Sequence, residues 1–110
     1  MLQAGCKLWL EKDGEKVFGR GPAQLLQKVE ELGSLRQAAL ALDMSYTKAW
    51  RLIGNLESAL GIPVLDKRIG GPDGGSSRLT PEAKALMARY ARMEQEIEAA
   101  ADAIFKKYFP

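Results

Sequence analysis

The chain has 110 residues and a net charge of +2, enough for one domain with a modest core and only mildly basic. It has no histidine and one cysteine, so it lacks the commonest general base and any zinc site of familiar spacing. No apolar run is long enough to span a membrane, and the start is not that of a signal peptide. We therefore expect a cytoplasmic protein that is not an enzyme and needs no cofactor or metal.

The single cysteine, Cys6, cannot form a disulfide within the chain. A lone cysteine is usually an incidental thiol. The alternatives are a redox switch or a disulfide between two chains, and the sequence leaves them open.

A β-hairpin is predicted over residues 7–19. Residues 7–12 alternate apolar and polar side chains, Asp13-Gly14 is a turn signal, and residues 16–19 can form the return strand. A two-stranded hairpin is marginally stable alone. We therefore expect it to pack against the helices or against a partner chain.

Three helices are predicted over residues 22–61. Pro22 suits the first position of the first helix, and Ser34 and Ser45 suit the N-caps of the second and third. Gly61 can end the third helix in a left-handed conformation. Three short helices in this order form the core of a helix-turn-helix, although an ordinary helical hairpin with a solvated polar face would show the same pattern.

The polar face of the third helix is the predicted DNA-binding surface, because a helix-turn-helix presents the start of this helix to base edges. Arg51 is the best candidate for a guanine or backbone contact. Tyr46 can stack on a sugar or touch a thymine methyl. The candidate DNA-binding residues in the helices are Ser34, Ser45, Tyr46, Thr47, Lys48, Arg51 and Asn55.

A wing is predicted over residues 62–79. Residues 62–69 read as a strand, residues 70–77 as a glycine-rich tip, and residues 78–79 as a short return strand. The other interpretation is an inert linker, but basic residues beside the tip favour a wing that meets phosphates or a minor groove. These residues are Lys67, Arg68 and Arg78.

A long helix is predicted over residues 80–108, with Thr80 as its N-cap and Pro81 at its first position. Apolar residues recur along it with heptad spacing, too far for one small core to cover. A helix folded back on its own domain is the alternative to a homodimer that pairs two such helices. The seam consists of Ala83, Leu86, Tyr90, Met93, Ile97, Ala100 and Ile104, of which Leu86, Tyr90, Met93, Ile97 and Ile104 are the expected dimer contacts.

These motifs resemble the DNA-binding domain of the ModE family of molybdate-responsive repressors and, more distantly, the winged helix-turn-helix of LysR-type regulators. The resemblance covers nearly the whole chain. It implies a mainly α fold with a small β part: a winged helix-turn-helix with an N-terminal β-hairpin and a long C-terminal dimerisation helix. The ModE-like residues are Gly33-Ser34-Leu35, Ala38-Ala39, Met44-Ser45-Tyr46, Ala49-Trp50, Ile53 and Leu56; the LysR-like ones are Leu56-Glu57, Leu60-Gly61-Ile62-Pro63 and Arg78-Leu79-Thr80-Pro81.

The resemblance also implies a function. A homodimer would read an inverted repeat in double-stranded DNA, with its two recognition helices about 34 Å apart. Arg51 matches an arginine of the LysR-type pattern, whereas Trp50 resembles ModE and is ambiguous between a core residue and a surface one.

In ModE-like regulators the molybdate anion binds in separate carboxy-terminal domains. This sequence ends at Pro110, directly after the long helix. We therefore expect that molybdate does not bind this chain directly. The rival hypothesis is a winged-helix module that binds proteins, or a partner that pairs with a larger regulator.

Overall fold

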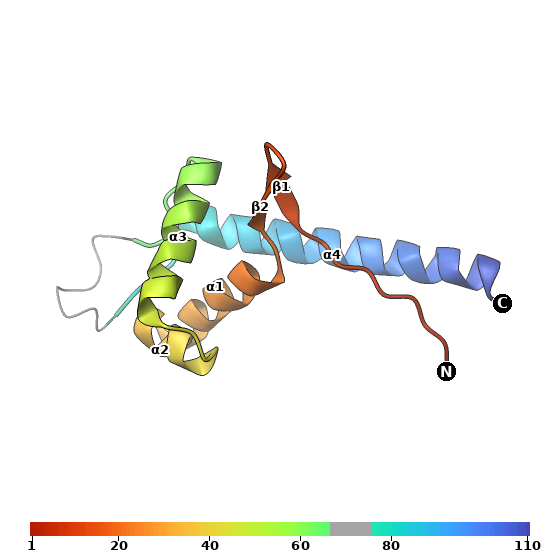
Figure 1. The fold of residues 1–110 in the computed structure, drawn as a ribbon, viewed down its shortest axis with the longest axis horizontal. Helices are drawn as coiled ribbons and strands as arrows, with labels where there is room; N and C mark the ends of the chain where they lie inside the picture. The colour runs from red at the N-terminus through yellow and green to blue at the C-terminus, as the bar shows by residue number, and fades with distance from the viewer. Residues whose placement is uncertain (67–75) are drawn as a thin grey trace.

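The computed structural model describes residues 1–66 and 76–110, which form a small hairpin, three short helices and one long helix (Figure 1). The predicted fold class, mainly α with a small β part, is confirmed. The predicted wing tip falls largely on residues 67–75, outside the described residues. The elements are β1 (Leu10–Lys12), β2 (Glu15–Phe18), α1 (Arg20–Leu32), α2 (Leu35–Ala41), α3 (Tyr46–Leu60) and α4 (Pro81–Tyr108).

The hairpin pairs β1 and β2 antiparallel, with the register shifting between Leu10 and Glu11. Asp13 and Gly14 both have positive φ, 53° and 82°, as a tight two-residue hairpin turn requires. The strands are shorter than predicted, since β1 begins at Leu10. The hairpin is fastened to α3 by Lys12, whose ammonium group donates a hydrogen bond of 2.8 Å to the carbonyl of Ala59.

The helices begin and end at the capping residues that the sequence predicted, except at the start of α1. The hydroxyl of Ser34 accepts from the amide of Gln37, and Gly61 ends α3 with φ 67°, both as predicted. The prediction that Pro22 opens the first helix is wrong, because α1 begins at Arg20. Pro22 is the third residue of the helix, where its missing N–H costs no intrahelical hydrogen bond.

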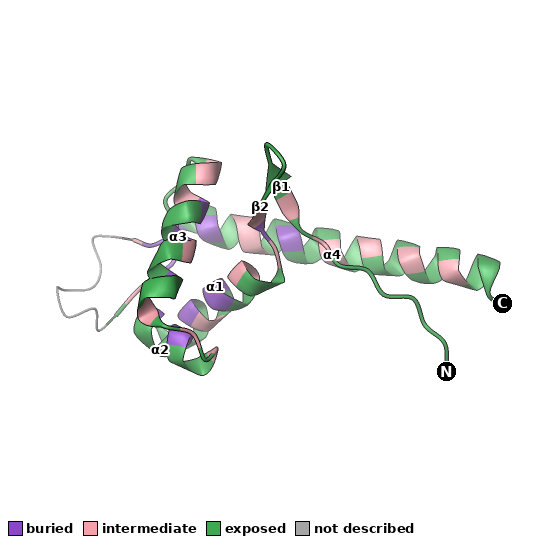
Figure 2. Cartoon of the chain, viewed as in Figure 1, coloured by how far each residue is buried: buried purple, intermediate pink, exposed green. Residues whose placement is uncertain are grey.

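One core holds the described chain together, and it lies where α1, α2 and the buried face of α3 meet the start of α4 (Figure 2). Hairpin and wing strands each contribute to it, so every element has residues in this single cluster. Its buried members are Phe18, Leu25, Leu26, Val29, Leu35, Ala38, Ala39, Ala49, Ile53, Leu56, Val64, Leu65, Leu79, Ala83 and Tyr90.

The long helix α4 begins as predicted and then leaves the domain. The hydroxyl of Thr80 accepts from the amide of Ala83 and donates to the carbonyl of Pro63. The first turns of α4 pack on the core, whereas its C-terminal half extends away from the other helices (Figures 1 and 2). The alternative to a homodimer was a helix that folds back on its own domain. The structure shows such packing for the first turns of α4 and not for its whole length.

Tyr90 corrects one predicted dimer contact. Its side chain is 5% exposed, its ring meets that of Phe18 edge-on at 5.0 Å, and its hydroxyl donates to the carbonyl of Leu8 at 2.8 Å. Tyr90 thus belongs to the core of its own chain. The heptad spacing of α4 did not reveal this, because a core stripe and a dimer seam share the same three-and-four spacing.

In the described part of the chain, no helix is long and apolar enough to cross a membrane. Cys6 is an exposed free thiol.

Candidate nucleic-acid interface

The polar face of α3 points outward because its apolar face is buried. Ala49, Ile53 and Leu56 are buried with spacings of four and three, so residues half a turn away must face solvent. The turn before α3 is closed by Asp43, whose φ of 56° reverses the chain, and by the amide of Met44, which donates to Ala39. These local features set α3 across α2 in a helix-turn-helix.

The first two turns of α3 carry the exposed polar group that the sequence predicted. Thr47 and Arg51 lie four residues apart on the outward face, and Lys48 is exposed beside them. Ser45 is exposed too, but its hydroxyl caps α3 by accepting from the amide of Lys48. Among the described residues, neither Lys48 nor Arg51 has a carboxylate partner, so both cations are available to a polyanion.

An aromatic and cationic cluster lies beside this polar group. The rings of Tyr46 and Trp50 meet edge-on, with centroids 6.1 Å apart, and the guanidinium of Arg36 lies 4.2 Å above the Tyr46 ring. The sequence left open whether Trp50 is a core or a surface residue; its side chain is 44% exposed, so it is not part of the core. Arg36 was not a candidate, and only its exposed position in the first turn of α2 could have indicated it.

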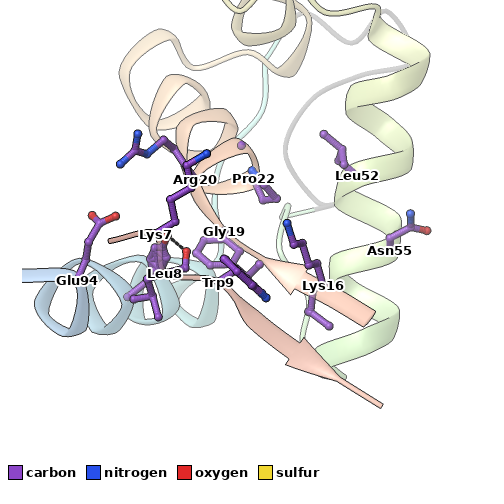
Figure 3. A pocket seen from close by; sticks show the side chains of 14 residues that line it. Lys7, Leu8, Trp9, Lys16, Gly19, Arg20, Pro22, Leu52, Asn55 and Glu94 are labelled. Atoms are coloured by element: carbon purple, nitrogen blue, oxygen red, sulfur yellow. Dashed lines mark hydrogen bonds between the residues drawn. The ribbon is translucent and has the colours of Figure 1, made fainter. Parts of the chain in front are cut away.

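Two further predicted contacts, Ser34 and Asn55, differ in their surroundings. Ser34 is buried, and its hydroxyl is used to cap α2, so we remove it from the DNA-binding set. Asn55 is exposed one turn after Arg51 on the same face of α3, at the end nearer the hairpin. It lines a cavity of about 460 Å³ together with Leu52 (Figure 3).

This cavity is bordered by side chains from the hairpin, α1, α3 and α4 (Figure 3). Lys16 lies over the ring of Trp9, with its ammonium nitrogen 4.5 Å from the ring centroid. Burial raises the pKa of Tyr90 at the cavity wall; the nearby Glu94 carboxylate adds to the rise, and Arg20 opposes it. The lining is mixed, since the Glu94 carboxylate and the Asn55 amide lie among the apolar and cationic side chains. In the described part of the chain, no group of acidic, cysteine or histidine side chains is arranged to hold a metal.

The base of the predicted wing pairs at one point, rather than along a strand from residue 62, and is anchored to α3. Leu65 and Leu79 form an antiparallel bridge, and the amide of Asp66 donates to the carbonyl of Arg78. The carboxylate of Glu57, on α3, accepts from the amides of Val64 at 2.7 Å and Leu65 at 3.5 Å. Lys67 and Arg68 lie outside the described residues, while Arg78 is exposed at the return strand.

A second anchor ties the return strand to the start of α2. The amide of Ser77 donates to the carbonyl of Gly33 at 2.8 Å, and its hydroxyl accepts from the amide of Leu35 at 3.1 Å. The wing base, α2 and α3 are therefore held together by hydrogen bonds as one surface. Helix-turn-helix, exposed recognition helix and adjoining wing define the class: this is a winged helix-turn-helix of the kind that binds DNA.

Comparison with known proteins gives the family. Residues 23–84 match the model of the bacterial regulatory helix-turn-helix proteins of the lysR family, and the chain belongs to that family. It is also similar to the molybdenum transport protein ModE of Azotobacter vinelandii, with 30% identity over 102 residues, 93% of this chain and 38% of that protein. The chain spans about a third of the length of the curated relatives it matches.

Solved structures agree on the fold. The DNA complex of the CbnR DNA-binding domain matches with a TM-score of 0.60 and 22% identity, covering 80% of this chain and 95% of that one. The structure of Vibrio fischeri DarR with DNA matches with a TM-score of 0.58 and 20% identity, covering 79% of this chain and 28% of that one. The chain is thus a ModE-like, LysR-type DNA-binding domain of a transcription regulator.

Proposed function

We propose that this protein is a cytoplasmic regulator that binds double-stranded DNA sequence-specifically as a homodimer. The observation that carries the proposal is the exposed row of Thr47, Lys48 and Arg51 on the capped first turns of α3, with the wing base held beside it. A helix in the major groove would read base edges and so select a sequence, whereas a basic wing on the phosphates would strengthen binding to any sequence. Nothing in this arrangement requires a catalytic role.

The second copy is proposed from the free half of α4. Met93 is 46% exposed and Ile104 is 57% exposed, while Ile97 is half-buried in an apolar cleft of about 510 Å³. Cys6 also lines that cleft. Apolar side chains exposed in heptad register are covered most simply by the same face of another chain.

This revises the predicted dimer contacts. Tyr90 is removed, and Leu86 is half-buried against its own core, so it can lie only at the edge of a contact. Met93, Ile97 and Ile104 remain as the proposed seam.

We also propose that molybdate does not bind this chain directly. The similarity covers 38% of the A. vinelandii ModE protein, and the resemblance implies that the anion binds in other domains of such regulators. Isothermal titration of the protein with sodium molybdate should give no saturable heat. A stoichiometric binding signal would contradict this part of the proposal.

The proposal is tested by fluorescence anisotropy with DNA from upstream of the protein's own gene, against random competitor at two salt concentrations. Binding should resist competitor and weaken with salt. Arg51→Ala should weaken specific binding by about 1–3 kcal/mol, roughly 5- to 150-fold. The matched control is Arg92→Ala, which removes an exposed arginine from the outward side of α4 and should leave affinity unchanged.

Two outcomes would contradict the proposal. Equal competition by any DNA would leave only nonspecific affinity. Absence of binding at low salt would favour the rival class, a module that binds proteins through α4.

A further inference from the structure

We propose that Trp50 is a specificity-determining residue that packs its indole against the C5-methyl group of a thymine, and that Tyr46 and Arg36 position it. This inference rests on the proposed function, because it requires α3 to lie in the major groove. It assigns a base preference to a side chain that carries no charge.

The first observation is the exposure of Trp50. The other large apolar side chains of α3 are buried or half-buried, including Ile53 at 1% and Leu56 at 2%, whereas Trp50 is 44% exposed on the solvent side. An exposed indole gains free energy only when something covers it, at about 25 cal/mol per Å² of apolar surface. A large apolar group placed among polar DNA-facing residues therefore points to an apolar partner on the DNA.

The second observation is a contrast with the other tryptophan. The indole N–H of Trp9 donates to the Glu11 carboxylate at 2.8 Å, and Lys16 lies over its ring. The indole N–H of Trp50 has no acceptor in the part of the chain that the structure describes. Trp9 is thus engaged within the fold, while both the ring and the donor of Trp50 remain available to a ligand.

The third observation is how Trp50 is held. Its edge-on contact with Tyr46, at an interplanar angle of 86°, fixes one side of the indole. Tyr46 is in turn fixed by Arg36, which comes from α2, so the stack spans both helices of the motif. The indole is presented in a defined orientation before DNA arrives, which lowers the ordering cost of recognition.

The chemistry of the groove selects the partner. In the major groove, the thymine methyl is the apolar feature of the base edges, and the remaining groups are hydrogen-bond donors and acceptors. Indole has one donor and no acceptor, so it cannot read guanine or adenine in the bidentate manner of arginine or asparagine. Trp50 should therefore select thymine next to the position that Arg51 reads.

The experiment is a selection of binding sites from randomised duplexes with the wild-type protein, Trp50→Ala and Trp50→Phe, each checked for native circular dichroism. Trp50→Ala should lose the thymine preference at one position of each half-site and keep the others. Trp50→Phe should keep part of it. The control is Leu40→Ala, which removes an apolar side chain that is 74% exposed on α2 and should leave every preference unchanged.

A second measurement removes the methyl group alone. Replacing that thymine with uracil should weaken wild-type binding about fourfold, the value of one buried methyl-sized group. The same replacement should leave Trp50→Ala unaffected, and Arg36→Ala should reduce the wild-type effect because the stack loses its support. The salt dependence of binding should be equal for the wild type and the two Trp50 variants, since these substitutions change no charge.

The outcomes separate the two proposals. If the wild-type protein selects no sequence at all, the proposed function fails. If it selects a clear motif and Trp50→Ala selects the same motif with the same sensitivity to uracil, the proposed function stands and the role of Trp50 is overturned.

Discussion

The two halves of α4 carry one continuous apolar seam but have different surroundings. In the first half, Ala83 and Tyr90 are buried at 0% and 5% exposure by the rest of the same chain. In the second half, Met93 and Ile104 are 46% and 57% exposed. Heptad spacing determines which face of a helix is apolar, whereas the neighbouring elements determine whether that face is covered within the chain or left for another molecule.

The hairpin makes the difference. Phe18 and the carbonyl of Leu8 bury Tyr90 from the N-terminal side of the chain. Farther along α4, Ala4 and Cys6 of the N-terminal segment only border the cleft that contains Ile104, which stays exposed. Changes to the first half of α4 should therefore affect folding, and changes to the second half should affect assembly.

The largest expected effect is that of Tyr90→Ala. It removes the edge-on contact with Phe18 and the hydrogen bond to Leu8, and it leaves a cavity in the core. The free energy of unfolding should fall by about 3–5 kcal/mol, as for other aromatic-to-alanine changes in cores. Urea denaturation followed by circular dichroism measures it. A loss below about 1 kcal/mol would show that Tyr90 is not part of the monomer core.

The next effect is that of Ile104→Glu on the proposed dimer. A charge in place of an apolar seam residue should raise the dimer dissociation constant at least tenfold, since burying an isoleucine is worth about 1.5–3 kcal/mol. Sedimentation velocity at several protein concentrations measures the dissociation constant. The helix content, followed by circular dichroism, should stay constant over the concentrations at which the dimer dissociates. The matched control is Ala99→Glu, on the outward side of the same helical turns. Equal weakening by both variants would mean that charge alone, rather than the seam, controls assembly.

The smallest effect is a pH dependence of stability above pH 10. Burial raises the pKa of Tyr90 in the folded protein above its ordinary value of 10.0, so the folded state binds this proton more tightly than the unfolded chain. The stability from this shift is complete below about pH 10 and is lost as the pH rises through the folded-state pKa. Stability measured from pH 8 to 11 should fall more steeply for the wild type than for Tyr90→Phe. Parallel curves would contradict the assignment.

The sequence predicted what local chemistry determines. The caps at Ser45, Thr80 and Gly61 each depend on residues within one helical turn, so pattern and residue type are sufficient to place them. The contacts that join distant segments were not predictable in this way. Tyr90 meets Leu8 across 82 positions, and Ser77 meets Leu35 across 42, and no periodicity reports on either pair.

In the candidate DNA-binding site, too, some residues were predictable from local pattern and others depended on how the helices pack. Thr47, Lys48 and Arg51 follow from the helical period of α3, because the buried stripe fixes the opposite face. Arg36 was missed, and Trp50 stayed ambiguous, because their surroundings depend on how α2 packs on α3. Ser34 was assigned to DNA by its residue type, but the requirement for an N-cap used its hydroxyl.

The contact between Tyr90 and Phe18 has a mechanical consequence. Among the described residues, Tyr90 is the last buried residue of α4 in the core, and about 27 Å of helix follows it to Tyr108, given a rise of about 1.5 Å per residue. A tilt of about 10° at this pivot would displace the far end by about 5 Å, because displacement grows with the length of a rigid helix. In the proposed dimer, the contact between the hairpin and Tyr90 therefore fixes the angle between α4 and the DNA-binding helices of the same chain. That angle would determine the distance between the two copies of α3, and so the spacing of the two halves of a binding site along the duplex.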